Sequence, residues 1–135
     1  MSRRSRAREV ALQVLYQDDL NPAPEAVDPA PFLWARLGSQ ELVEFAGSLV
    51  DGVRRNRGEL DQLLTSTADN WALGRMAATD RNVMRIGAFE ILYTSTPNRV
   101  AINEAVELAK RYGAAQSAQF VNGVLDRILA EHGKE

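Results

Sequence analysis

Hydrophobic residues recur along this chain at spacings of three and four, which places them on one face of an α-helix. No segment alternates apolar and polar residues between hairpin turns, as a half-buried strand does. Segments with the helical spacing are 6–20, 32–37, 39–57, 59–68, 79–95, 100–113 and 114–129. The pattern predicts an all-α fold, a compact bundle of about seven helices forming one domain over residues 1–135, in two packed halves of about 1–68 and 69–135.

Glycine and proline mark the expected ends of these helices. Four of the five prolines fall within residues 21–31, a density that no helix tolerates, so an extended loop is expected there. We expect Gly38 to end the short second helix, Ser39 to cap the third, and the third to close with arginines just before Gly58. Gly113 can take the left-handed conformation that stops a helix.

The sequence of the second half predicts which of its residues are buried in the core. The segment 79–95 is apolar nearly all round, which is typical of a centrally buried helix, and its charged residues are expected to pair internally. Gly123 interrupts the apolar stripe of the last helix, where a glycine usually permits close backbone approach. Trp71 is expected to anchor the turn between the halves. The 100–113 helix should bury one face, made by Ala101, Ala105, Leu108, Ala109 and Tyr112.

Composition excludes several classes of function. The chain has 135 residues, no cysteine and one histidine, His132, close to the end of the chain. It therefore has no thiolate nucleophile or cysteine-based zinc site, and it contains no glycine-rich phosphate loop. We expect a protein that is not an enzyme and needs no cofactor or metal. No apolar run approaches the roughly 20 residues that cross a bilayer, and no signal peptide is found, so a cytoplasmic location is expected.

Charge is distributed unevenly. Arg3, Arg4, Arg6 and Arg8 fall within the first eight residues, which contain no acid, whereas the remainder carries 12 basic and 18 acidic residues. A cationic arm on an acidic body suggests a polyanion partner, and arginine suits RNA because it pairs with phosphate and stacks on bases. Composition alone leaves a disordered N-terminus equally open. Tyr16 favours RNA, because it lies opposite the apolar face of its helix and can stack on a base; the alternative is that it packs beneath a later helix.

Three stretches resemble a known family. The C-terminal VAINEAVELAKRYG and FVNGVLD closely resemble the NusB family of bacterial transcription antitermination factors. The N-terminal SRRSRAREVALQVLYQ resembles the arginine-rich first helix of that family, and LTSTADNWALGRMAATDRNVMRIGAFEIL resembles its central segment. The resemblance implies a protein that binds single-stranded boxA-type RNA together with the ribosomal protein NusE, in the transcription elongation complex, and supports ribosomal RNA transcription.

The same resemblance implies site residues. Asp80 would lie near the surface that contacts NusE, and Arg99 stands where the family often has a basic residue. Gln116 stands where the family can carry an acid, and Phe120 belongs to the apolar stripe, so core packing is its strong alternative. The positions implied to bind RNA are Arg3, Arg4, Arg6, Arg8, Tyr16, Arg99, Gln116, Ser117 and Phe120.

Other functions remain open from the sequence. The N-terminal RNA-binding domain of ribosomal RNA methyltransferases shares this fold, although such an enzyme needs a following domain with a glycine-rich cofactor loop, which is not found before Glu135. A purely protein-binding helical scaffold would leave the arginines and Tyr16 without a role. An exposed Leu12 beside Tyr16 would suit either the surface of a homodimer or an intramolecular contact.

Overall fold

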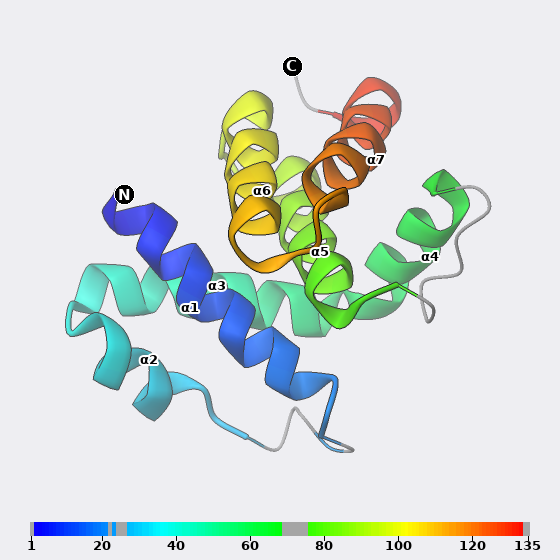
Figure 1. Cartoon of the computed structure of the whole chain (residues 1–135). Helices are drawn as coiled ribbons and strands as arrows, with labels where there is room; N and C mark the ends of the chain where they lie inside the picture. Colours follow the sequence, from blue (N-terminus) through cyan, green and yellow to red (C-terminus); the bar gives the residue numbers. More distant parts are fainter. Residues whose placement is uncertain (1, 22, 24–26, 69–75, 134–135) are drawn as a thin grey trace. The chain divides into compact units, whose positions relative to one another are not determined.

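The computed structural model describes residues 2–21, 23, 27–68 and 76–133, and Trp71 lies outside them. The described residues form α-helices and no strand (Figure 1). The predicted all-α class with about seven helices is therefore confirmed. The helices are α1 (Arg3–Asp18), α2 (Ala30–Leu37), α3 (Gln40–Arg55), α4 (Arg57–Thr67), α5 (Ala78–Tyr93), α6 (Asn98–Tyr112) and α7 (Ser117–His132).

The chain divides into two compact units, Met1–Arg55 with α1 to α3 and Asn56–Glu135 with α4 to α7. The boundary precedes the expected position near residue 68, because α4 contacts α5 and α7. Helix α3 ends at Arg55 and Arg57 opens α4, so the expectation that the third helix extends to the residue before Gly58 is wrong.

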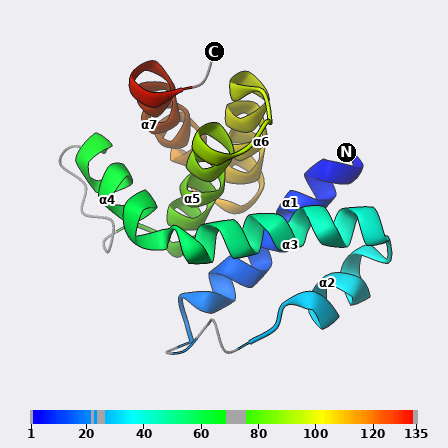
Figure 2. The ribbon, with the colours of Figure 1, turned by 180° about the vertical axis from the view of Figure 1, so that it is seen from behind.

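In the first unit α1 crosses α3 obliquely and packs against it, and α2 contacts both (Figures 1 and 2). The predicted apolar face of α1 is confirmed by four buried residues, Ala7, Val10, Ala11 and Val14. Leu12 is buried as well, so of its two interpretations the intramolecular contact is supported, and Leu12 is no basis for a homodimer surface. Near the ends of α1 and α3, Arg54 donates hydrogen bonds of 2.8 and 2.9 Å to the two carboxylate oxygens of Asp18. This bidentate geometry fixes both helix ends.

Helix α5 forms the centre of the second unit and contacts α4, α6 and α7 (Figure 2). Every residue from 82 to 91 is buried, which confirms the predicted central helix. Arg85 donates hydrogen bonds of 2.7 and 2.8 Å to the carboxylate of Asp61 on α4, and Glu90 accepts one of 2.9 Å from Thr96. The Arg85–Asp61 ion pair confirms the expected internal pairing for Arg85, and it offsets the free energy needed to bury that charge.

Close helix approach occurs at a different glycine from the one predicted. A Cβ at Gly87 on α5 would lie 2.6 Å from Leu125 Cδ1 on α7 and 3.2 Å from the Cβ of Ala105 on α6. A Cβ at Gly123 would meet no atom of the described residues within 4 Å, and this glycine is exposed on α7. The prediction that Gly123 marks a close approach is therefore wrong.

The two glycines expected to end helices behave differently. Gly38 follows α2 with a φ of +61°, as a left-handed stop residue does. Gly113 follows α6 with a φ of −93°, so the expectation of a left-handed stop there is wrong. Tyr112, expected on the buried face of α6, is 45% exposed, whereas Ile102 on that helix is fully buried.

Candidate nucleic-acid interface

The N-terminal arginines lie within α1 rather than on an arm that precedes it. The helix begins at Arg3, ahead of the expected start at residue 6, because the Ser2 hydroxyl accepts a hydrogen bond of 3.0 Å from the Ser5 N–H and caps the first turn. No acidic residue lies in that turn. The free N–H groups of a helix start carry partial positive charge, to which Arg3 and Arg4 add two full charges. This end of the first unit is therefore suited to bind an anion such as phosphate.

Three of the four arginines remain accessible. Arg3 and Arg4 are exposed, although Arg3 donates a hydrogen bond of 3.2 Å to the Ser39 hydroxyl. Arg6 is partly exposed and forms an ion pair of 2.6 Å with Glu9 on the next turn. Glu9 is buried, so Arg6 also compensates a buried carboxylate, whereas Arg3 and Arg4 are exposed and can turn their guanidinium groups to phosphate.

Arg8 is held differently from the other three. Its side chain is only 4% exposed, and its guanidinium lies 5.0 Å from the centre of the Phe45 ring on α3. Arg4 lies over the same ring at 4.6 Å. A desolvated cation over an aromatic face is attracted to it more strongly than an exposed one. Arg8 therefore attaches α1 to α3 and offers little surface to a ligand.

Tyr16 lies near the other end of α1. Its side chain is 41% exposed, which confirms the expected orientation away from the apolar face and gives no support to packing beneath a later helix. It lies thirteen positions after Arg3, or about 20 Å along a helix that rises about 1.5 Å per residue. One helix thus presents cations at its start and an aromatic ring at its end.

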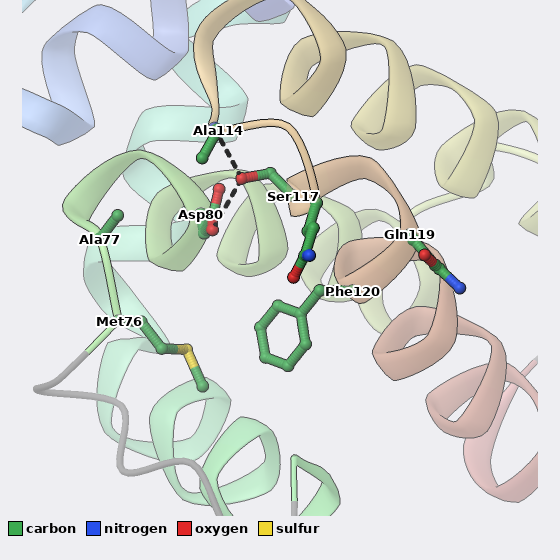
Figure 3. A pocket seen from close by; sticks show the side chains of 8 residues that line it. Met76, Ala77, Asp80, Ala114, Ser117, Gln119 and Phe120 are labelled. Atoms are coloured by element: carbon green, nitrogen blue, oxygen red, sulfur yellow. Dashed lines mark hydrogen bonds between the residues drawn. The ribbon is translucent and has the colours of Figure 1, made fainter.

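A second group of predicted residues meets where α6 connects to α7. The Ser117 hydroxyl accepts a hydrogen bond of 2.9 Å from the Ala114 N–H and donates one of 3.0 Å to Asp80 Oδ2 (Figure 3). Asp80 lies in the first turn of α5, and Gln116 is exposed just before α7. The structure therefore brings Asp80, expected to face a protein partner, into contact with Ser117, expected to face RNA.

A pocket of about 410 Å³ opens at this hydrogen bond (Figure 3). The side chains of Met76 and Phe120 form its apolar part, and Phe120 is half-buried, so its ring both packs in the fold and lines the pocket. The second carboxylate oxygen of Asp80, Oδ1, is buried and accepts no hydrogen bond from the residues that the structure describes. The lining residues are Met76, Ala77, Asp80, Ala114, Gln116, Ser117, Gln119 and Phe120.

Arg99 does not join this group. It lies in the first turn of α6, where its guanidinium pairs at 3.1 Å with Asp126 on α7. Asp126 is ten residues beyond Gln116, which is about 15 Å along the helix. The Arg99 side chain is 61% exposed, so the pair is weak and the guanidinium is open to another anion.

Comparison with known proteins decides the family. The NusB family profile matches residues 5–130 of this chain. The chain belongs to the NusB family. It is 47% identical over 132 residues to the transcription antitermination protein NusB of Anaeromyxobacter dehalogenans, a match that covers 96% of this chain and 92% of that protein. These findings confirm the resemblance seen in the sequence, and they favour antitermination over a methyltransferase domain.

Solved NusB structures share the fold. T. maritima NusB superposes with a TM-score of 0.85 at 34% identity, covering 99% of this chain and 94% of that one. A crystal structure of the antitermination factors NusB and NusE in complex with dsRNA matches with a TM-score of 0.81 at 27% identity, covering 98% of this chain and 99% of the matched chain. The second structure contains NusE and RNA, as the NusB resemblance implied, although its RNA is double-stranded and the resemblance implied a single strand.

The NusB resemblance did not indicate the whole pocket. Met76, Ala77, Ala114 and Gln119 complete its wall and were not predicted. These residues carry no charge and belong to no binding motif, so the sequence shows no sign of a site at them. Only the folded structure brings them together around the pocket. Among the described residues, no group of three or more histidine or acidic side chains could hold a metal ion. Within the same residues, no helix combines the length and apolar character that a bilayer crossing requires.

Proposed function

We propose that this chain is a non-enzymatic, RNA-binding transcription antitermination factor that acts with NusE. The observation that carries this proposal is the likeness of nearly the whole chain to the structure of NusB and NusE in complex with dsRNA. Its relatives in Anaeromyxobacter dehalogenans and Myxococcus xanthus are named for the same activity. The chain would act as one domain over residues 1–135, in the cytoplasm, within an elongation complex that transcribes ribosomal RNA.

The proposed RNA is single-stranded and of the boxA type. In the first unit, Arg3, Arg4 and Arg6 contact phosphates around the capped start of α1, where helix dipole and side-chain charge add. Tyr16 stacks on a base further along the helix, because its ring is exposed and every base has a face that can stack. Arg8 supports this surface by packing on Phe45.

The second unit would contribute at the connection between α6 and α7. The exposed Gln116 amide can hydrogen-bond to a base edge, and Phe120 offers an aromatic surface at the pocket. Ser117 is buried at the same connection, so it would support Gln116 and Phe120 rather than touch the RNA, and Arg99 would contact a phosphate elsewhere along the RNA. Asp80, in the first turn of α5, lies on the side proposed to contact NusE.

Neutralising the exposed arginines tests the proposal. Arg3→Gln/Arg4→Gln keeps residues that favour a helix but removes two cations, so the log-log dependence of RNA affinity on salt should lose about 1.4 units, at about 0.7 per phosphate on single strands. Fluorescence anisotropy with boxA-type RNA at several salt concentrations measures this slope.

The matched control is Arg36→Gln/Arg55→Gln, which removes two exposed cations of α2 and α3 from the same unit. Its salt slope should stay at the wild-type value. Equal slopes for wild type, the Arg3/Arg4 variant and the control would show that the start of α1 does not bind phosphate. Failure of the wild type to bind RNA with or without NusE would refute the proposed function.

A further inference from the structure

The Ser117 hydroxyl joins two parts of the second unit that the proposed function assigns to different ligands. It accepts a hydrogen bond from the N–H of Ala114, in the connection between α6 and α7. It also donates a hydrogen bond to Asp80 Oδ2, in the first turn of α5 (Figure 3). Ser117 is itself 4% exposed, so it offers almost no surface for a ligand. Its hydroxyl is therefore placed to act through its neighbours.

Both hydrogen bonds depend on the single Ser117 hydroxyl. Ala114 lies beyond the end of α6, where the last helical bond is donated by Gly113 to the Ala109 carbonyl. The connection packs closely on Ser117, because a Cβ at Gly113 would lie 2.6 Å from the Ser117 Cβ and Oγ. The other carboxylate oxygen of Asp80 has no hydrogen-bond donor among the described residues. Removing the hydroxyl would thus leave a backbone donor and a carboxylate without their partner.

We propose that Ser117 is a positioning residue that couples RNA binding at the α6–α7 connection to partner binding at Asp80. The inference deepens the proposed function and rests on it. Gln116 directly precedes Ser117, and Phe120 follows it within one helical turn, so a shift of Ser117 displaces both. A partner that fixes the position of Asp80 also fixes Ser117, and with it the conformation of the α6–α7 connection. By linkage, RNA bound there strengthens partner binding by the same factor.

The first experiment separates the hydrogen bond at Asp80 from its charge. Asp80→Asn and Asp80→Ala both remove the negative charge, but only asparagine keeps an oxygen that can accept from Ser117. In the absence of NusE, Asp80→Asn should bind boxA-type RNA roughly fivefold more tightly than Asp80→Ala, the ratio expected for one hydrogen bond. Fluorescence anisotropy measures both affinities under the same conditions.

The second experiment measures coupling directly. The coupling factor is the ratio of RNA affinity with saturating NusE to RNA affinity without it. In Ser117→Ala this factor should fall to about one, and the amide of Ala114 should exchange its hydrogen faster. The control is Ser66→Ala, which removes a hydroxyl whose bond of 3.0 Å goes to the Leu63 carbonyl on its own helix. The control should keep the wild-type coupling factor.

Three results would each overturn the inference. They are equal RNA affinities for the two Asp80 variants, a Ser117→Ala variant that keeps the wild-type coupling factor, and a coupling factor of one in the wild-type protein itself. If Ser117→Ala fails to fold, the Asp80 pair decides, because both of those variants retain Ser117. Failure of the proposed function is distinguishable, since the wild-type protein would then bind neither RNA nor NusE.

Discussion

Arg8 differs from its neighbouring arginines because its side chain is buried on α3. We expect Arg8→Ala to lower the free energy of unfolding by about 2 kcal/mol, since it removes a desolvated cation from the Phe45 ring together with the packing of its aliphatic stem. Chemical denaturation measures this change. The matched control is Arg3→Ala, an exposed arginine in the same helix, which should alter the free energy of unfolding by no more than about 0.5 kcal/mol. Similar values for the two variants would contradict the structural role of Arg8.

Tyr16, unlike Arg8, is expected to contribute to RNA binding and little to the stability of the fold. Tyr16→Ala should weaken RNA binding by about 1–3 kcal/mol, the range for one base stacked on an aromatic ring, and Tyr16→Phe should weaken it much less. Because the side chain is 41% exposed, neither change should lower the melting temperature greatly. RNA affinity and melting temperature measured on both variants test this. A Tyr16→Ala variant that melts far below wild type, yet binds RNA normally when folded, would show that the ring stabilises the fold instead.

At the scale of single residues, the sequence predicted which face of α1 is apolar but not how far burial extends around the helix. The outward position of Tyr16 follows from helical spacing alone. Arg8 and Leu12 are also buried, because α1 is covered on more of its circumference than one stripe. Periodicity cannot anticipate this, since the width of the buried face depends on neighbours that are distant in the sequence.

Glycines on two helices provide a test at the scale of elements. Gly123→Ala should stabilise the protein by about 0.5–1 kcal/mol, because alanine favours the helix and its Cβ meets nothing within 4 Å in the described structure. Gly87→Ala gains the same helix propensity but must displace Leu125 and Ala105, and overpacking a core typically destabilises by about 1–3 kcal/mol. Its net effect should therefore be neutral to destabilising. Thermal and denaturant unfolding compare the two, and a more stable Gly87→Ala than Gly123→Ala would contradict the close contact of α5 with α6 and α7.

Helix identity was easier to predict than helix ends. All helical segments read from the spacing are present among the described residues, because each has an apolar face to bury. The start of α1 was missed although Ser2 is a good capping residue, since the arginines after it suggested a free arm. Gly58 was read as a stop, yet it lies within α4, where tertiary contacts outweigh its low helix propensity.

For the molecule as a whole, the arginines and the proposed NusE surface should be separable. Arg3→Gln/Arg4→Gln should bind NusE with wild-type affinity in the absence of RNA, because the variant changes only the start of α1 and leaves Asp80 intact. Calorimetry with NusE alone measures this. Loss of NusE binding in this variant, with an unchanged melting temperature, would show that the two cations also contact the partner.

The candidate site was only partly predictable at this scale. Asp80 and Ser117 were both singled out, but for different ligands, and their hydrogen bond spans 37 positions of the chain. The meeting depends on how α5, α6 and α7 pack within the second unit, which no local pattern specifies. Arg99 was grouped with Gln116, whereas the antiparallel course of α6 and α7 places these residues near opposite ends of the helix pair.

The capped start of α1 also affects the rate of RNA binding and the conformational entropy that the protein loses on binding. A disordered cationic segment loses conformational freedom when it folds on its ligand, which offsets part of the favourable contact energy. Arg3 and Arg4 already lie in a hydrogen-bonded helical turn, so their backbone is ordered before any encounter. Preorganisation of this kind leaves side-chain rotamers as the main freedom lost at this end. Association would then be limited by diffusion and electrostatic steering and would require no folding step.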